Sequence, residues 1–253
     1  MNAIKIITPD WDVPADIVAG ISTRAGGVSE QPYSSFNLAR HVGDSGANVD
    51  RNLQLLEKLY PQRLQWQWLH QVHSSNVHRV VKASVAMTAD ALSTQRPELV
   101  CCLLTADCLP VFFAACNGGE VAMAHAGWRG LAAGILENTL ASCSTPAHAM
   151  VAWLGPAIGP CHFEVGAEVK EIFLAGANNI EDKQALGKCF SETENPGKAL
   201  CDLYAIAKLK LARLGLERVW GGGSCTFCQP QLFYSFRRDG VTGRMASFIY
   251  IDS

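Results

Sequence analysis

Two apolar stretches of this 253-residue chain carry reactive side chains at places where a buried strand would not need them. In "LLTADCLPVFFAA" (103–115), Asp107 and Cys108 interrupt the apolar run. In "VAMAHAGWRG" (121–130), His125 ends one apolar run and precedes a turn that contains glycine. A cysteine thiolate is a nucleophile and a soft metal ligand, and reactive groups are commonly placed where strands pass into loops. These two stretches are therefore the candidate reactive centre.

The histidines offer partners for such a cysteine. There are only seven, and "WLHQVHSSNVHRV" contains His70, His73 and His78. One Cys and two His at the ends of apolar segments suit a zinc site with an open fourth position. Zinc in such a site lowers the pKa of bound water to about 7 and supplies hydroxide. The alternative is a packing cysteine with unconnected surface histidines, and spacing alone does not decide between the two.

A second feature suits the binding of an anion. In "HAGWRGLAAGI", Gly127 and Gly130 permit close approach of the backbone, Arg129 supplies a planar guanidinium, and the next helix presents free N–H groups. The alternative is a helix start with a surface arginine. The Gly/Pro-dense stretch "LGPAIGPCHFEVG" (154–166) fits either a rigid pocket wall or a sharp chain reversal.

Composition and charge argue against a nucleic-acid-binding, secreted or membrane protein. The chain is 49% hydrophobic and 17% charged, which allows a substantial core, and a net charge of -2 gives no basic footprint for nucleic acid. The N-terminus lacks the pattern of a secretory signal, and the longest apolar run (99–116) contains Asp107, which argues against a membrane span. These features predict a soluble, cytoplasmic protein with no nucleic-acid or membrane partner, whose ten cysteines are reduced thiols.

Cys225 and Cys228 form a single Cys-x-x-Cys in "SCTFCQ". A structural zinc site would need a second pair of Cys or His ligands at matching spacing, and none is evident along the sequence. No structural zinc is therefore expected there.

The secondary structure expected from apolar patterning is mixed. Strands are predicted at 17–22, 77–81, 100–104, 111–115, 121–124, 149–154, 219–221 and 246–251, and helices at 48–59, 131–142, 166–174 and 202–214. "FRRDGVTGRMASFIYI" suggests a strand, a turn and a final strand, and the polar segment 178–199 suggests a surface excursion. Because strands and helices alternate without a strict βαβ rhythm, one mixed α/β domain over residues 1–253 is expected.

Seven motifs in order resemble the YfiH-like family: "STRAGGVS", "FNLARHVGD", "QVH", "TADCLPV", "HAGWRG", "LGPAIGPCHFEVG" and "RRDGVTGRMASFI". The resemblance spans residues 22–249 and is closest to the gammaproteobacterial branch. It implies an α/β fold with two mixed sheets packed between helices in four α-β-β-α layers, similar to the cytotoxic-necrotizing-factor catalytic domain. It also implies one zinc held by His73, Cys108 and His125, with Asp107 orienting the site.

The family carries three functional labels. One is a laccase-domain polyphenol oxidase, but a multicopper laccase needs many histidines, largely in His-x-His pairs, and this chain has seven with no such pair. The resemblance implies zinc as the cofactor, with copper binding only adventitiously. A second label implies zinc-dependent phosphorolysis of adenosine, inosine or methylthioadenosine, and deamination of adenosine. For that chemistry Cys108, His125, His73 and Asp107 are the expected catalytic residues, Arg129 and Arg24 candidates for phosphate, and Asn37 a candidate for ribose or base.

The third label, peptidoglycan editing, implies an amidase that removes misincorporated L-serine from a muramyl precursor. Either a Cys108 nucleophile paired with His125 or a zinc-bound water suits that reaction. A non-enzymatic binding protein with a structural Cys/His metal site is a further alternative, and His70 as a fourth ligand would favour it. For the enzyme, a small-molecule substrate and a monomer or homodimer are expected.

Overall fold

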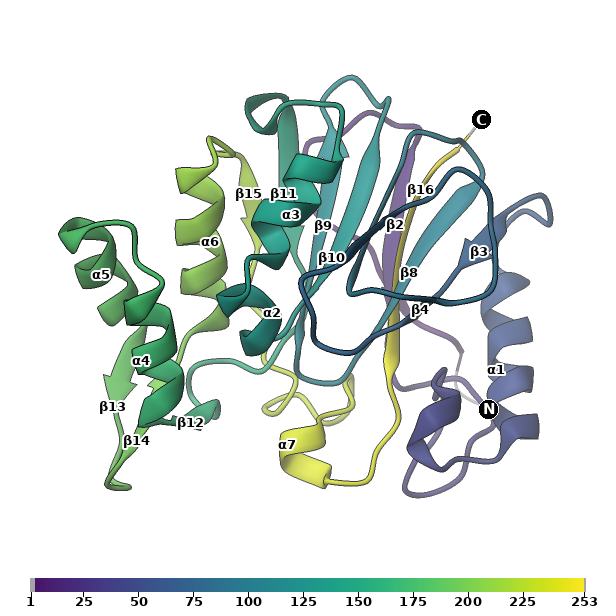
Figure 1. The fold of residues 1–253 in the computed structure, drawn as a ribbon. Coiled ribbons are helices and arrows are strands. Elements are labelled where there is room, and N and C mark those ends of the chain that lie inside the picture. The colour runs from purple at the N-terminus through teal and green to yellow at the C-terminus, as the bar shows by residue number, and fades with distance from the viewer. Residues whose placement is uncertain (1–2, 253) are drawn as a thin grey trace.

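Two large mixed sheets form the centre of the computed structural model, which describes residues 3–252 (Figure 1). The five-stranded sheet has the order β1 (Ile6–Ile7), β2 (Ile17–Ser22), β16 (Met245–Ile251), β8 (Leu99–Thr105) and β3 (Gln65–Gln67). The six-stranded sheet has the order β15 (Val219–Gly221), β11 (Met150–Leu154), β9 (Leu109–Ala115), β10 (Val121–Ala126), β7 (Ala91–Thr94) and β5 (Val77–Arg79). Only the β3–β8, β11–β15 and β5–β7 pairs among these are parallel.

Helices cover the outer faces of both sheets. The helices are α1 (Gly46–Glu57), α2 (Trp128–Ala132), α3 (Ile135–Ser142), α4 (Ala167–Ala175), α5 (Ile180–Gly187), α6 (Leu203–Arg213) and α7 (Phe236–Asp239), with 3-10 turns at Arg40–Val42 and Ala147–Ala149. Figure 1 shows α1 beside the five-stranded sheet and α2, α3 and α6 beside the six-stranded one. This arrangement confirms the expected mixed α/β fold with two sheets between helices.

Three separate hydrophobic clusters fill the interfaces between the layers. The neighbours Phe112 and Phe113 of β9 point to opposite faces, so that Phe113 packs with α3 and α6 while Phe112 packs against the other sheet. In β8, Cys102 packs toward Leu56 of α1, and Cys101 lies between the sheets. Because both faces of the central strands β8, β9, β10, β11 and β16 are buried, these strands are largely continuous apolar runs rather than alternating ones.

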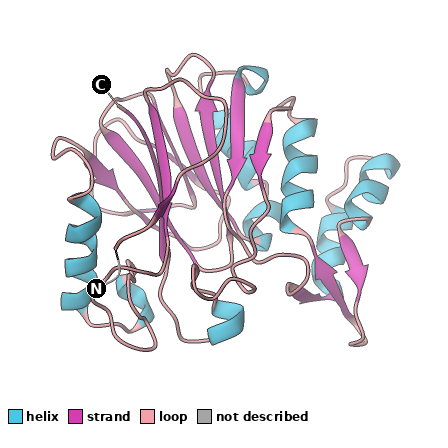
Figure 2. Cartoon of the chain, turned by 180° about the vertical axis from the view of Figure 1, so that it is seen from behind, coloured by secondary structure: helices cyan, strands magenta, loops and turns pink. Residues whose placement is uncertain are grey.

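Two smaller sheets complete the architecture. One joins β12 (Glu164–Gly166), β14 (Lys198–Cys201) and β13 (Phe190–Glu192), and the other pairs β4 (Leu69–His70) with β6 (Met87–Thr88). The three-stranded sheet lies with α4 and α5 at one side of the molecule, as the view from behind also shows (Figure 2). The segment 178–199, expected to be a surface excursion, is therefore largely α5, β13 and part of β14.

All eight predicted strands are confirmed, as are three of the four predicted helices, with ends within two residues. The helix predicted at 131–142 is instead two helices, because Gly134 adopts a left-handed φ of 87° between α2 and α3. The strand predicted at the start of "FRRDGVTG" is wrong: Phe236–Asp239 forms α7, whose cap Ser235 accepts a hydrogen bond from the Arg238 N–H.

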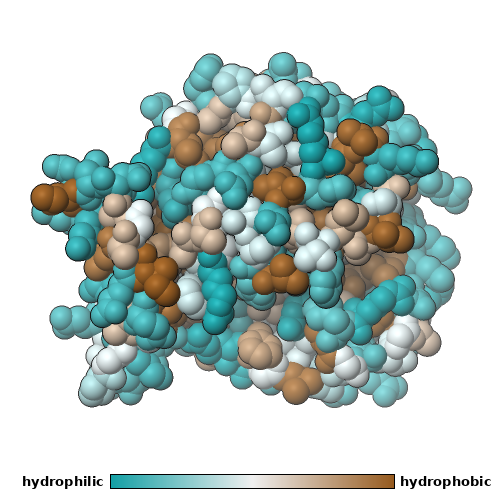
Figure 3. Space-filling model, viewed as in Figure 1, coloured by the Kyte–Doolittle hydropathy of each residue, from teal (hydrophilic) through white to brown (hydrophobic). Residues whose placement is uncertain are grey.

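The surface is chemically mixed. On the face drawn in Figure 3, apolar side chains are dispersed in small groups among hydrophilic ones. Within residues 3–252, no helix is both long enough and apolar enough to cross a bilayer.

Candidate active site

His73, Cys108 and His125 come together at one end of the six-stranded sheet. Their ligand atoms all lie within 4.8 Å of one another. Cys108 Sγ is 3.7 Å from His73 Nε2, and the two imidazole rings have centroids 4.8 Å apart at an interplanar angle of 65°. The structure thus brings together the three residues that the family resemblance implied.

Strand register explains how Cys108 reaches His125. β9 and β10 are antiparallel, with His125 opposite Pro110 and Ala126 opposite Leu109. Cys108 immediately precedes β9 and therefore lies at the edge of the sheet where β10 ends. The pairing of the two apolar runs as the hairpin of β9 and β10 therefore brings Cys108 and His125 to the same end of the sheet.

His73 reaches the same place from the loop between β4 and β5. Its φ is 59°, and Asp107 beside Cys108 has a φ of 97°. Left-handed conformations at residues other than glycine cost on the order of 1–3 kcal/mol and persist only where the surroundings impose them. For His73 that group is the carboxylate of the residue just before β7.

Asp90 is that carboxylate, and it lies fully buried just before β7. It accepts hydrogen bonds from His125 Nδ1 at 2.9 Å, from the His73 N–H at 3.0 Å, and from the N–H and hydroxyl of Ser74 at 2.6 and 2.7 Å. One buried anion therefore fixes the imidazole of one site histidine and the backbone of the other. Sequence reasoning missed Asp90.

A signal for Asp90 was present in the sequence. The tripeptide Thr-Ala-Asp occurs twice, at 88–90 and at 105–107, each time next to an apolar run. Only the second copy is followed by a cysteine, Cys108. The first copy is the one whose carboxylate holds the site.

The ionisable groups of the trio favour a thiolate beside an imidazolium in metal-free protein. Burial opposes ionisation of Cys108, but the charge of His125 and hydrogen bonds from His125 and His73 outweigh it, and the pKa of the thiol falls to about 6. Burial also opposes the charge on His125, but Cys108 and the hydrogen bond from Asp90 raise its pKa to about 9. For Asp90, burial is outweighed by hydrogen bonds from His125 and Ser74, which bring its pKa well below the usual range.

The trio fits a metal ion. Because His125 Nδ1 is engaged by Asp90, its Nε2 is the nitrogen left to bind metal, as is common for metal-binding histidines. The space beside the trio is kept by Gly127, where an added Cβ would lie 2.9 Å from Cys108 Sγ and 3.3 Å from His73 Cδ2. Two imidazoles and one thiolate are ligands that zinc accepts, and three protein ligands leave a position for substrate.

A cavity of about 500 Å³ opens in front of the trio. Its lining includes three arginines, Arg129, Arg237 and Arg244, and a single carboxylate, Asp107. Trp128, Phe163 and Phe236 supply aromatic surface. The other polar side chains of the lining include His41, His70 and Gln71. The site therefore joins three side chains that could hold a metal ion to a cationic, partly aromatic pocket. Although His70 lines this pocket, it does not belong to the ligand cluster.

Asp107 has a different role from the one expected. Its carboxylate accepts hydrogen bonds from the Thr226 hydroxyl at 2.6 Å and from the Arg237 N–H at 2.7 Å. It thereby ties the loop after β15 and the start of α7 to the residue before Cys108. The carboxylate that orients the histidines is Asp90, so the sequence-based assignment of that role to Asp107 is corrected.

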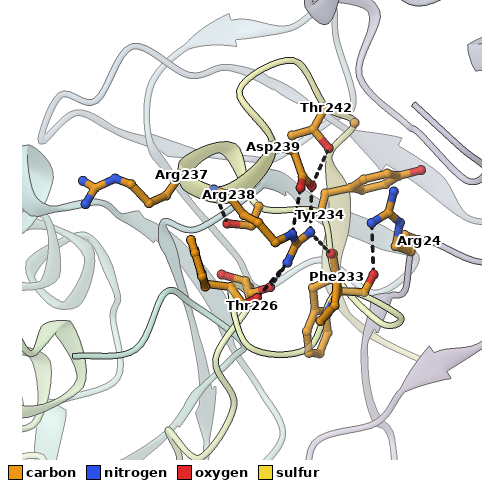
Figure 4. A network of polar contacts seen from close by, with 12 residues as sticks. Arg24, Thr226, Phe233, Tyr234, Arg237, Arg238, Asp239 and Thr242 are labelled. Carbon is orange, nitrogen blue, oxygen red and sulfur yellow. Dashed lines mark hydrogen bonds and ion pairs between the residues drawn. The ribbon is translucent and has the colours of Figure 1, made fainter. Parts of the chain in front are cut away.

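Arg24 and Asn37 do not line the pocket. The Arg24 guanidinium donates to the carbonyls of Ser34 and Pro230 and lies over the ring of Tyr234 (Figure 4). Asn37 is fully buried and hydrogen-bonds to the backbone of Ala39 and to the Arg244 N–H. Both residues hold loops together, and the expected phosphate and ribose contacts are not supported.

Arg129 does line the pocket, on its exposed rim, where its guanidinium lies 4.4 Å from the Trp128 ring centroid. Sequence reasoning missed Arg237 and Arg244, the other two pocket arginines. Arg237 leaves α7 and donates to the Glu164 carbonyl at 2.7 Å, while Figure 4 shows it directed away from the network around Arg238.

Comparison with known proteins places this site in a family. The family model described as multi-copper polyphenol oxidoreductase laccase matches residues 18–252. Proteins named purine nucleoside phosphorylase are similar along their whole length. The Shigella flexneri protein YfiH is 43% identical over 98% of this chain and 99% of its own, and the Haemophilus influenzae protein is 42% identical over 98% and 100%.

Solved structures agree. A Neisseria meningitidis protein, 42% identical, superposes with a TM-score of 0.91 over 98% of this chain and 99% of its own. YlmD from Geobacillus stearothermophilus, 32% identical, gives a TM-score of 0.82 over 94% and 93%. With fold, length and sequence all in accord, the chain belongs to the family of the multi-copper polyphenol oxidoreductase laccase model, which the YfiH proteins share.

Proposed function

We propose that this chain is a purine nucleoside phosphorylase that acts at the His73, Cys108 and His125 centre. The observation that carries the proposal is the pairing of this trio with a pocket lined by three arginines and one carboxylate. Such a pocket favours an anionic co-substrate such as phosphate. The names of the full-length relatives support the same reaction.

His73, Cys108 and His125 would hold a zinc ion. When bound, zinc would supply Lewis acidity at the floor of the pocket. Asp90 would keep His125 in the tautomer whose Nε2 faces the metal.

The other residues act on the substrates. In phosphorolysis a phosphate oxygen forms a bond to the anomeric carbon while the bond from that carbon to the purine nitrogen breaks, and the purine leaves with a proton. Arg129, Arg237 and Arg244 would bind and orient the phosphate, and Trp128, Phe163 and Phe236 offer apolar surface to the base. His41 and His70 are the lining imidazoles outside the trio, and either would be available to donate the proton.

The test is product analysis by mass spectrometry on zinc-loaded protein. Inosine with phosphate should give hypoxanthine and ribose 1-phosphate, and Cys108→Ala should abolish both. With adenosine as the substrate, deamination at the same centre would appear as formation of inosine. Absence of phosphate-dependent products from inosine, adenosine and methylthioadenosine would overturn the proposal.

A second candidate, amide hydrolysis, is favoured by a specific geometry. Cys108, His125 and Asp90 follow the order of nucleophile, base and orienting carboxylate, with His125 Nδ1 2.9 Å from Asp90. A larger cavity of about 1140 Å³ shares His41, His70 and two leucines with the site pocket and contains Trp66 and Trp68. It would accommodate an extended substrate such as a serine-containing muramyl precursor.

The two candidates separate in one experiment. Serine release by protein freed of metal, with formation of a Cys108 acyl-enzyme visible by intact mass, would support the thiol route. Nucleoside turnover that needs metal, with no serine release, would support the phosphorylase.

A further inference from the structure

A second cluster of metal-binding side chains lies apart from the trio. Cys161 and His162 come from the loop after β11, and Cys225 and Cys228 from the loop after β15. β11 and β15 are parallel neighbours, and an additional bridge pairs Ala157 with Cys225, so the two loops leave the sheet side by side. The pair that the Cys-x-x-Cys lacks along the sequence is thus supplied by a segment more than sixty residues away.

The sulfur–sulfur distances in this cluster match the edges of a tetrahedral zinc site, and the sulfur–nitrogen distances are slightly shorter than those edges. Cys161 Sγ lies 3.6 Å from Cys228 Sγ and 3.9 Å from Cys225 Sγ. His162 Nδ1 lies 3.2 Å from Cys161 Sγ and 3.3 Å from Cys228 Sγ, and all four ligand atoms lie within 4.8 Å of one another. Zinc–ligand bonds of ordinary length at tetrahedral angles require about 3.8 Å between sulfurs and about 3.6 Å between sulfur and nitrogen.

Two further contacts hold the ligands in this arrangement. The His162 ring stacks on Phe227, with centroids 4.0 Å apart and planes at 16°, which fixes the plane of the imidazole. The Gly159 N–H points at Cys225 Sγ at 3.2 Å, a donor that would stabilise a thiolate. At Gly159 an added Cβ would lie 3.2 Å from Cys225 Cβ and 3.5 Å from Cys161 Sγ, so the loop needs a small residue there.

We propose that Cys161, His162, Cys225 and Cys228 form a second metal site that holds one divalent ion of the zinc type. Three thiolates and one imidazole complete a tetrahedron, so this site leaves no position for substrate and is structural. The trio, by contrast, has three candidate ligands that face a cavity and leave a position open for substrate.

The site would brace one wall of the substrate pocket. Between the cluster cysteines, Thr226 donates to Asp107, the residue before Cys108. Arg238 donates to the carbonyls of Thr226 and Phe227, as Figure 4 shows for Thr226. Ile158 and Phe163, on either side of the Cys161–His162 pair, line the pocket. An ion at the cluster would therefore cross-link two loops that position the pocket without contacting the substrate.

The test uses full-length Cys108→Ala protein, in which the trio is disabled and the second cluster is intact. After zinc loading and removal of free metal, this protein should retain one zinc per chain. X-ray absorption at the zinc edge should show three sulfurs at about 2.3 Å and one nitrogen at about 2.0–2.1 Å. Adding Cys161→Ser and Cys228→Ser should reduce the metal to none, while adding Cys143→Ser, a thiol outside both clusters, should leave one.

Either of two results would overturn the proposal. One is a Cys108→Ala protein that binds no zinc. The protein is fully reduced beforehand, so a disulfide between Cys161 and Cys228 cannot account for that result. The other is a zinc shell with fewer than three sulfurs. Absorption spectroscopy needs no change in the cluster, so the test remains decisive where the serine variants fail to fold. It is also independent of the proposed enzyme activity.

Discussion

His125 and Asp90 form a buried pair in which Nδ1 and Oδ1 are 2.9 Å apart, and the same carboxylate receives the N–H of His73. Asp90 therefore sets the direction of the His125 imidazole and the backbone position of His73. A single buried side chain outside the pocket lining thus holds both site histidines.

Replacing Asp90 with asparagine should weaken metal binding at the trio by about 10–100-fold, because His125 loses its charged partner and its fixed tautomer. Chelator competition on purified protein measures this affinity. Asp107→Asn is the matched control, since that carboxylate contacts Thr226 and Arg237 rather than a ligand. Equal affinity in wild type and Asp90→Asn would contradict the orienting role of Asp90.

In metal-free protein, alkylation of Cys108 should follow a titration near pH 6 instead of the usual 8.5 of a free thiol. The sign follows from the lowered pKa: the thiolate is present above about pH 6 and is lost as the pH falls through that value. The rate is measured by iodoacetamide labelling and peptide mass spectrometry of the Cys108 peptide. His125→Gln should move the midpoint upward, since the positive charge beside the thiolate is lost, and an unmoved midpoint would refute this cause.

Gly127→Ala should disrupt the centre while leaving the fold in place. The backbone φ of -63° accepts alanine, but the new Cβ would lie 2.9 Å from Cys108 Sγ. We expect loss of zinc affinity and of activity, measured by chelator titration and product assay. Gly223→Ala, where an added Cβ meets no atom within 4 Å, is the control and should behave like wild type.

The two arginines that the sequence suggested for phosphate should behave differently. Arg129→Ala should raise the KM for phosphate with little change in stability, since Arg129 lies on the exposed pocket rim. Arg24→Ala should leave that KM unchanged and lower the free energy of unfolding by about 1–3 kcal/mol, because the carbonyls of Ser34 and Pro230 lose their donor. Kinetics as a function of phosphate and urea denaturation measure the two effects. The reverse pattern would restore Arg24 to the phosphate site.

Local sequence determined much of this protein. Apolar runs specify the buried strands of both sheets, because a strand covered on two faces must be apolar throughout. Asp202 and Gly215 bound α6 as capping chemistry predicts, with Asp202 accepting from the Ala205 N–H. The motifs "QVH", "TADC" and "HAGWRG" also identified the three residues that meet at the site.

Tertiary structure alone decided which polar groups meet. Asp90 reaches His125 because β7 and β10 are paired, and Cys161 reaches Cys228 because β11 and β15 are. Arg24 and Asn37 resemble binding residues in sequence, but loop carbonyls and amides take up their hydrogen bonds. Strand order and loop closure join residues far apart in the chain, and the local periodicities that reveal helices and strands carry no information about those partners.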